Sequence, residues 1–313
     1  MLNIKKANAN KPPRVMIFGI EGVGKTTLGA KADKPLFITP EGGADHVLGA
    51  DGLPVDEISG VKTWAQLRAA IKDLIKEDHG YKTLVLDSAD WIEKICHAQI
   101  IGKSDKDIIR VNGGYSAGLR DSERLHKELI EDLSTLRETK GMNIIVTAHY
   151  QIKEVKDPDM VHDYDAYQIK CDERVSSLWR EWVDALLFAR FNTYTSQKDD
   201  GAKARAIGDD GRIVYTTKRP AFQAKNRYRL PPEMPFTENF WNEFMAYAKK
   251  GVQPEEVRTQ SDLLEEINGL LSYIPDEKTR EVVLKTVESA GDNLQQLDAI
   301  LSRILEITNK KGQ

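Results

Sequence analysis

One short stretch of this sequence has the residue types and the spacing needed to hold a chain of phosphates. Residues 19–26 read Gly-Ile-Glu-Gly-Val-Gly-Lys-Thr and fit the pattern G-x-x-x-x-G-K-[ST]. Glycine lets a backbone turn tightly enough for its N–H groups to wrap an anion. In this pattern the lysine reaches the terminal phosphates, and the hydroxyl of the last residue binds Mg²⁺. The stretch, called the phosphate loop below, therefore predicts a site for ATP and Mg²⁺.

The segments on either side of the phosphate loop fit the same prediction. Arg14 to Phe18 is an apolar run of strand type, and residues 27–32 can begin a helix whose N-terminal end attracts an anion. An ordinary glycine-rich turn is the alternative, but a strand before the loop and a helix after it favour a nucleotide site. The residues expected to contact the nucleotide are Gly19, Glu21, Gly22, Val23, Gly24, Lys25, Thr26 and Thr27.

A second strand supplies a carboxylate for the metal. Residues 83–88 read Thr-Leu-Val-Leu-Asp-Ser, a pattern typical of a buried strand that ends in an acid. We expect Thr26 and Asp87 to hold Mg²⁺ together, with Asp87 acting through water. An aspartate at such a place is more commonly a helix N-cap, but its pairing with a phosphate loop favours the metal role.

Composition limits the class of protein. The chain has 313 residues, of which 40% are hydrophobic and 30% charged, so it can bury a large α/β core and a smaller appendage. No apolar run approaches the roughly 20 residues of a membrane helix, and the basic N-terminus lacks an apolar signal segment. Cys96 and Cys171 are too few for a disulfide framework. We therefore expect a cytoplasmic protein with free thiols and no membrane partner.

Strand-like runs alternate with helix-like patterns along the chain, which is typical of a mostly parallel sheet. Further apolar runs occupy residues 35–39 and 143–148, and helical spacing occupies residues 63–76, 89–101 and 119–137. Residues 150–174 are charged and lack a clear period, so a long functional loop is expected there. A hairpin is expected between strands at residues 204–207 and 212–215, turning at Asp210 and Gly211.

These patterns divide the chain into an N-terminal arm at residues 1–13, an α/β core at residues 14–250 and an acidic helical region at residues 251–313. Three helices are expected in the last region, at residues 262–272, 277–289 and 293–307. Their apolar stripes would bury against one another or against the core. Such an acidic appendage could instead dock a partner, for example a single-strand-binding protein.

The order of these motifs resembles the RecA core. It is similar in particular to the minimal RecA-like ATPases of bacteriophages, the fourth type of Sak single-strand annealing protein, often described only as AAA-family ATP-binding proteins. The resemblance spans about Arg14 to Pro235. Beside the phosphate loop it rests on four short segments, Pro40-Glu41-Gly42-Gly43, Leu86-Asp87-Ser88, Thr147-Ala148-His149-Tyr150 and Ala224-Lys225-Asn226-Arg227-Tyr228. It implies an α/β P-loop NTPase with a RecA-like sheet that hydrolyses ATP and promotes DNA strand annealing or exchange.

The resemblance also implies roles for particular residues beside Lys25. Glu41 matches the catalytic glutamate that orients or deprotonates the attacking water, although an acidic turn residue is the alternative. His149 matches a γ-phosphate sensor, where RecA itself has glutamine, and a plain strand-end histidine is the alternative. Lys225 and Arg227 match basic residues that act on the ATP of a neighbouring subunit.

Such an arrangement implies a homo-oligomer, either a ring or a filament, in which hydrolysis depends on assembly. A solvated basic stretch or direct DNA contact is the alternative for Lys225 and Arg227, and Lys218 and Arg219 are rival candidates. Two loops match the RecA DNA loops, at residues 110–120 and 150–174. Their lysines, arginines and tyrosines suit single-stranded DNA, although the second loop is also acidic.

Three other functions remain open from the sequence. A RecA-like motor or loader would act on duplex DNA or on protein, and a P-loop small-molecule kinase would carry an acceptor site. A nucleotide-gated scaffold would hydrolyse little ATP, and the presence of Glu41 argues against it.

Overall fold

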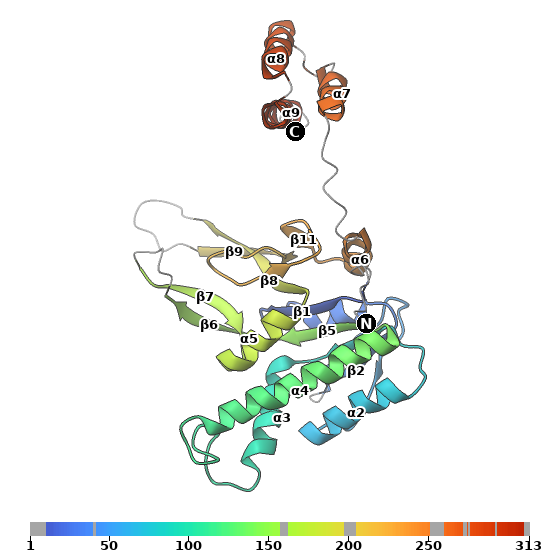
Figure 1. Cartoon of the computed structure of the whole chain (residues 1–313), viewed down its shortest axis with the longest axis vertical. Helices are drawn as coiled ribbons and strands as arrows, with labels where there is room; N and C mark the ends of the chain where they lie inside the picture. Colours follow the sequence, from blue (N-terminus) through green and yellow to red (C-terminus); the bar gives the residue numbers. More distant parts are fainter. Residues whose placement is uncertain are drawn as a thin grey trace, which may run out of the picture. The chain divides into compact units, whose positions relative to one another are not determined.

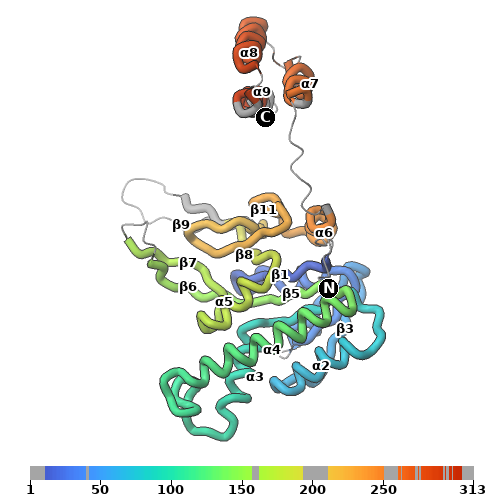
Figure 2. Tube along the Cα trace, in the orientation of Figure 1, coloured from blue at the N-terminus to red at the C-terminus, as the bar shows by residue number. Residues whose placement is uncertain are grey.

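The computed structural model describes residues 11–39, 42–156, 162–196, 205–250, 260–271, 274, 276–291 and 293–309. Figure 2 traces the path of the chain. The chain divides into two compact units, Met1–Gly251 and Val252–Gln313.

The first unit is built on one sheet of nine strands among the described residues (Figure 1). The strand order is β11-β9-β8-β1-β5-β4-β2-β3, with β10 paired to β8. In the part of the sheet that runs β3-β2-β4-β5-β1-β8, each strand is parallel to its neighbours. β9 and β10 pair antiparallel with β8, and β11 pairs antiparallel with β9. The strands are β1 (Arg14–Gly19), β2 (Pro35–Ile38), β3 (Asp56–Glu57), β4 (Thr83–Leu86), β5 (Asn143–Ala148), β8 (Ala185–Ser196), β9 (Arg205–Tyr215), β10 (Lys225–Asn226) and β11 (Glu233–Pro235). The predicted α/β fold with a mostly parallel sheet is confirmed.

Helices cover both faces of this sheet. Alternate residues of β1 show why, because Val15 and Ile17 pack in one apolar cluster while Met16 and Phe18 pack in the other. A parallel strand buried on both faces reads as a continuous apolar run. The first cluster includes residues of α1 (Lys25–Ala30) and α6 (Phe240–Lys250). The second includes residues of α2 (Trp64–Lys76), α3 (Ala89–Ile101), α4 (Ala117–Lys140) and α5 (Glu173–Trp182).

The prediction of a long loop over residues 150–174 was wrong. The segment contains an antiparallel hairpin of β6 (Tyr150–Val155) and β7 (Tyr164–Ile169), followed by the start of α5. This hairpin forms a small sheet of its own. Its pairs include Glu154 with Asp165 and Lys153 with Ala166, so neither strand shows the apolar alternation of a half-buried strand. Hydrophobic periodicity therefore does not predict this hairpin.

The predicted turn at Asp210 and Gly211 was also wrong. Both residues lie within β9, which pairs with β8 on either side of them, through residues 205–208 and 212–215. The register shifts between Phe191 and Thr193 of β8, opposite residues 208–212 of β9. Extra residues in one strand form a bulge, which tolerates the same residue types as a turn. The turn signal in the sequence therefore marks a bulge.

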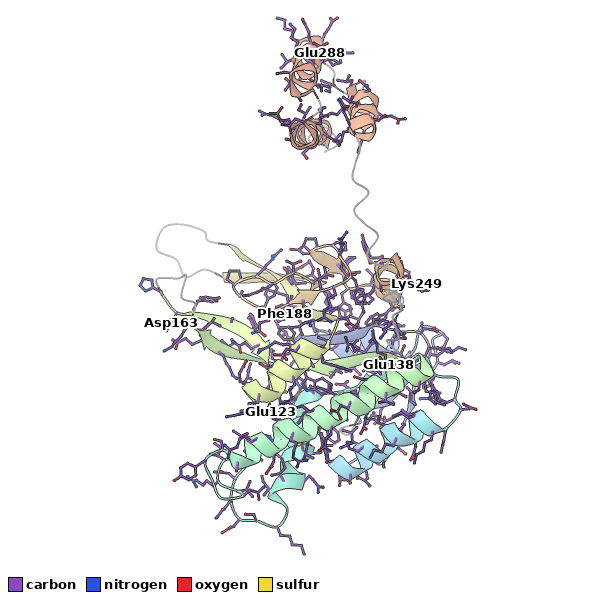
Figure 3. The ribbon with its side chains drawn as sticks, in the orientation of Figure 1. Glu123, Glu138, Asp163, Phe188, Lys249 and Glu288 are labelled. Carbon is purple, nitrogen blue, oxygen red and sulfur yellow. The ribbon has the colours of Figure 1, made fainter. Side chains whose placement is uncertain are left out.

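Phe188 of β8 shows how the centre of the first unit packs (Figure 3). Its ring is fully buried, and its centroid lies 5.0 Å from that of Phe18 on β1 and 4.6 Å from that of Phe222. The ring of Tyr167 on β7 packs on Phe188 at 5.2 Å. The β6–β7 hairpin is thus anchored to the core by an aromatic side chain.

The second unit consists of α7 (Gln260–Leu271), α8 (Glu277–Ala290) and α9 (Leu294–Asn309) among its described residues. The three predicted helices agree with these to within a few residues. The unit has its own apolar cluster, formed by Leu263, Ile267, Ile274, Ala290, Leu297, Leu301 and Ile304. Across both units, none of the described helices has the length and apolar character to cross a bilayer.

Candidate nucleotide-binding site

The phosphate loop connects β1, at the centre of the parallel sheet, to the first turn of α1. Gly22 and Gly24 have φ values of 75° and 95°, and Gly24 is the N-cap of α1. These values lie in the left-handed region, which glycine adopts without steric cost. Val23 between them is buried, whereas Glu21 and Thr27 are exposed. The backbone of the loop therefore curls above the carboxyl end of the central strand.

Gly19 is required by a close approach between strands. A Cβ atom at this position would lie 1.9 Å from the carbonyl oxygen of Ala189 on β8. The next amide, Ile20 N–H, donates to the same carbonyl at 3.2 Å. The first glycine of the motif thus lets the loop begin while the β1–β8 pairing is still intact.

Lys25 is buried inside the loop. Its Nζ donates to the carbonyl oxygens of Gly19 and Ile20, both at 3.0 Å. Burial lowers the pKa of Lys25, and the nearby carboxylates of Asp87 and Asp90 partly oppose that effect. A buried ammonium close to the loop is suited to bind the phosphates of a nucleotide.

Asp87 joins three elements of the site. Its Oδ2 accepts from the Thr26 hydroxyl of α1 at 2.6 Å, and its Oδ1 accepts from the Thr147 hydroxyl of β5 at 2.5 Å. Because β4, β5 and β1 are parallel, their carboxyl ends meet at one edge of the sheet. The carboxylate is thereby fixed beside the phosphate loop.

The groups around the loop fit Mg²⁺ and a nucleotide. Mg²⁺ is usually held by one or two carboxylates together with phosphates and water, and Asp87 with Thr26 supplies such a partial set. The described residues contain no group of three or more His, Cys, Asp or Glu side chains that could hold a metal ion. Nothing lies within 4 Å of a Cβ placed on Gly22, so the loop faces open space there. Bound Mg²⁺ would neutralise charge on the terminal phosphates.

Pro40 and Glu41 lie outside the described residues, so the predicted catalytic glutamate has no structural account. The chain on its far side is described. A Cβ at Gly43 would lie 3.9 Å from Asp87 Oδ2, which brings this segment to the metal side of the site.

His149 directly follows β5 and contacts a carboxylate of α3. Its Nδ1 lies 2.9 Å from Oδ2 and 3.1 Å from Oδ1 of Asp90, and its backbone N–H donates to Asp90 Oδ1 at 3.1 Å. Hydrogen bonding to Asp90 raises the pKa of His149 although burial opposes it. Burial would raise the pKa of Asp90, but the bonds from His149 outweigh it and bring that pKa to about 2. Asp90 therefore favours the protonated form of the imidazole, while the nearby Lys25 ammonium opposes it.

Lys225 and Arg227 lie near the amino ends of the parallel strands, opposite the end that carries the phosphate loop. Lys225 pairs with Leu186 near the amino end of β8, and its Nζ donates to the carbonyls of Arg180 and Glu181 at 2.8 and 2.9 Å. Burial is the main cause that lowers the pKa of Lys225. The phosphate loop follows the carboxyl end of β1, so within one chain Lys225 is separated from it by the length of the strands.

Arg227 belongs to an ion cluster at this amino edge. Its Nη1 lies 3.2 Å from Asp184 Oδ1, which also binds Arg14 at 2.6 Å, while Arg137 lies 3.3 Å from Oδ2. Three guanidinium groups thus share one carboxylate, and the side chain of Arg227 stays about half exposed, at 53%. Of the rival candidates, Arg219 stacks on Tyr215 and pairs with Glu233, and Lys218 is exposed.

The two loops predicted to bind DNA differ in the groups they expose. Tyr115 is 94% exposed at the tip of the loop between α3 and α4, where Arg120 donates to its carbonyl at 2.7 Å. In the hairpin, Tyr167 packs inward on Phe188 and Tyr150, so it is not available to stack on a base. Both segments project toward the same side of the unit in Figure 1.

Three polar residues near the phosphate loop were missed by sequence reasoning. Thr147 is the penultimate residue of the predicted strand β5 and belongs to a segment that carries the resemblance, but no role was predicted for its hydroxyl. Asp90 lies three residues after Asp87 in the first turn of α3, which is also the position of a common helix-start acid. Arg212 of β9 donates to the Val23 carbonyl at 3.3 Å and carries no local signal at all.

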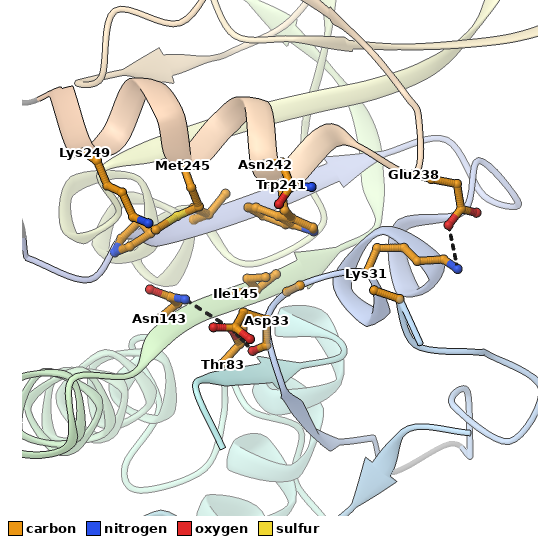
Figure 4. Close-up of a pocket in the computed structure, with 14 residues that line it drawn as sticks. Lys31, Asp33, Thr83, Asn143, Ile145, Glu238, Trp241, Asn242, Met245 and Lys249 are labelled. Carbon is orange, nitrogen blue, oxygen red and sulfur yellow. Dashed lines mark hydrogen bonds and ion pairs between the residues drawn. The ribbon is translucent and has the colours of Figure 1, made fainter. Parts of the chain in front are cut away.

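A cavity of about 350 Å³ lies away from this site, between α6 and the amino ends of the central strands (Figure 4). Trp241 and Met245 of α6 line one side, and Asn143, whose side chain donates to Thr83 at 3.2 Å, lies on the other. Lys31 at its margin pairs with Glu238 at 2.7 Å. Because its walls include the amino ends of β4 and β5, this cavity is not the nucleotide site.

A glycine loop between the central parallel strand and a helix, with a carboxylate from a neighbouring strand on its threonine, defines a P-loop ATPase. The comparison with known families agrees. The chain belongs to the AAA domain family AAA_24, whose model matches residues 11–228. Among curated proteins the sequence has no match.

Proposed function

We propose that this ATPase binds single-stranded DNA as a RecA-like homo-oligomer and uses ATP to promote strand annealing or exchange, as in the phage proteins that its motifs resemble. The observation that carries the proposal is that the β6–β7 hairpin starts at the nucleotide site. It begins at Tyr150, immediately after His149 at the nucleotide site, and Lys170 N–H donates to the His149 carbonyl at 2.9 Å. Binding or hydrolysis of the nucleotide would therefore act directly on the residues from which the hairpin extends.

The surface offered to DNA combines this hairpin with the loop that carries Tyr115. An exposed aromatic ring can stack on an unpaired base, and basic side chains can neutralise its phosphates. Lys156 and Lys170 on the hairpin are exposed, as is Arg110 on the loop, whose side chain is 79% exposed. These groups suit sequence-tolerant contact with a single strand.

Assembly would complete the catalytic site. Glu41 would orient the attacking water, His149 would sense the γ-phosphate, and Lys225 or Arg227 would reach the ATP of the next subunit. The half-exposed guanidinium of Arg227 and the surplus of cations around Asp184 suit an incoming phosphate chain. The second unit would remain available to dock a partner such as a single-strand-binding protein.

The decisive experiment measures ATP hydrolysis by the full chain with single-stranded DNA, with duplex DNA and without DNA, while light scattering follows assembly. We expect single-stranded DNA and ATP together to produce large assemblies and to stimulate turnover. Lys25→Ala should abolish turnover, because it removes the ammonium inside the phosphate loop. Asp78→Asn, on an exposed carboxylate remote from the loop, serves as the matched surface control.

Other outcomes would point elsewhere. Stimulation by duplex DNA with strand unwinding would favour a motor or loader. Turnover that ignores DNA, without any assembly, would refute the recombinase proposal and direct the search to small phosphate acceptors of a kinase.

A further inference from the structure

A second cationic group lies against the phosphate loop, on the side away from the metal carboxylate. Arg212 of β9 donates from Nη1 to the carbonyl oxygen of Val23 at 3.3 Å. A Cβ at Gly24 would lie 2.8 Å from that Nη1 atom and 3.2 Å from Cζ of Phe236. The absence of a side chain at Gly24 therefore lets both residues approach the loop closely.

Arg212 and Phe236 form a stacked cation–aromatic pair. The Arg212 guanidinium carbon lies 4.6 Å from the centre of the Phe236 ring. The Phe236 backbone N–H donates to the Arg212 carbonyl at 3.3 Å, which holds the two residues side by side. Arg212 is exposed and Phe236 is half-buried, so the stack is open to solvent beside the loop.

Strand register explains why Arg212 and Phe236 lie level with the phosphate loop along the strand direction. Gly19 of β1 pairs with Ala189 of β8, and Phe191 of β8, two residues further on, pairs with Arg212. Arg212 therefore projects from beyond the carboxyl end of β1, where the loop begins. Phe236 follows β11, whose Pro235 pairs with Ile213.

The strand order gives the direction in which a nucleotide would extend. Asp87 follows β4, which lies on the β5 side of β1, whereas β9 and β11 lie on the β8 side. Terminal phosphates and Mg²⁺ held at Thr26 and Asp87 leave the nucleoside end to point the opposite way. That direction leads to Arg212 and Phe236.

We propose that Arg212 and Phe236 form the nucleobase site of this ATPase, in which the flat heteroaromatic base stacks against this cation–aromatic pair. A planar delocalised cation beside an aromatic ring suits a purine face, which a lysine ammonium would not match. The inference rests on the nucleotide site described above, and it does not depend on DNA.

Equilibrium binding of ATP and of inorganic tripolyphosphate to the full chain, both with Mg²⁺ and without DNA, separates base contacts from phosphate contacts. Arg212→Gln and Phe236→Leu should each weaken ATP binding about tenfold, and tripolyphosphate binding should change less than twofold. Arg212→Lys should behave like Arg212→Gln, because it restores the charge but not the plane. Arg124→Gln, on an exposed guanidinium of α4, should leave both affinities unchanged.

Two results would overturn the proposal. Equal losses for ATP and tripolyphosphate, with rescue by Arg212→Lys, would make Arg212 a phosphate contact. Unchanged ATP affinity in both Arg212→Gln and Phe236→Leu would place the base elsewhere. Lys25→Ala should weaken both ligands, so failure of the phosphate site is distinguishable from failure of the base site.

Discussion

Asp87 is the residue at which the two sides of the candidate site meet. Its two carboxylate oxygens accept from Thr26 on α1 and Thr147 on β5, so its orientation is fixed from both directions. Hydrogen bonds to a charged group are shorter and stronger than neutral ones. If Asp87 and Thr26 hold Mg²⁺, they are positioned before the metal binds, which would reduce the cost of ordering them.

The pair of His149 and Asp90 predicts a pH-dependent contribution to stability. The pKa of His149 is raised from 6.5 and that of Asp90 is lowered to about 2. The raised histidine pKa contributes stability below about pH 6.5, and this is lost as pH rises through the higher folded value. The lowered aspartate pKa contributes stability above its usual value of 3.8, and this is lost as pH falls through about 2.

Asp90→Asn should therefore cost more stability at pH 5.5 than at pH 8.5. We expect a loss of about 1–2 kcal/mol at the lower pH, because both groups are partly exposed and screened, and clearly less at the higher pH. Urea unfolding at the two pH values measures the difference. Asp132→Asn, which removes one of the two carboxylate partners of Arg68 and involves no histidine, should cost the same at both. Equal costs for Asp90→Asn at both pH values would contradict the prediction.

At the scale of elements, α3 connects the nucleotide site to the β6–β7 hairpin. The helix starts two residues after Asp87, and its Asp90 and Glu93 lie one turn apart. Asp90 binds His149 before β6, and Glu93 accepts from the Asp172 N–H after β7 at 2.8 Å. Burial raises the pKa of Glu93 to about 7. The carboxyl group that accepts from the Asp172 N–H therefore has a pKa near neutral pH. One helix thus holds both ends of the hairpin.

The close pairing of β1 with β8 leaves no space for a side chain at Gly19. Gly19→Ala should destabilise the unliganded chain by roughly 3 kcal/mol or more, because its Cβ would overlap the Ala189 carbonyl and its φ is 153°. Gly22→Ala is the matched variant, since its φ is 75° but its Cβ would meet open space. Backbone strain alone should cost about 1–2 kcal/mol there. Urea unfolding would contradict this account if Gly19→Ala were no worse than Gly22→Ala.

At the scale of the whole molecule, the phosphate loop and Lys225 lie at opposite edges of one sheet. A residue at the amino edge can act on ATP only in another subunit, which requires a head-to-tail interface. If Lys225 acts in this way, each subunit carries two half-sites. An assembly of different variants can then restore a complete site.

Lys25→Ala and Lys225→Ala should each be inactive alone but partly active when mixed. Random assembly of equal amounts would pair an intact phosphate loop with an intact Lys225 at about a quarter of the interfaces. Recovery of ATP hydrolysis near that fraction is the expected result. A mixture of Lys25→Ala with Asp87→Asn should stay inactive, because both changes affect the same half-site. If the first mixture assembles and still hydrolyses no ATP, Lys225 does not act in trans.

Local pattern was enough to predict much of this protein. Glycine spacing located the phosphate loop, and apolar periodicity located the central strands, the long helices and the three helices of the second unit. Such signals are readable because a buried strand or an amphipathic helix repeats over a few residues. Hydrophobic period could not locate the β6–β7 hairpin, because its charged strands form their own sheet.

What the tertiary structure decided is which distant residues share a site. Thr147 of β5 donates to Asp87, Asp90 of α3 binds His149, and Arg212 of β9 donates to the phosphate loop. Local sequence patterns did not predict these three contacts. Lys225 and Arg227, in contrast, lie at the other edge of the sheet. Strand order and register arise from long-range packing of the apolar faces, so they determine these neighbours, whereas the sequence alone determined the loop around which they gather.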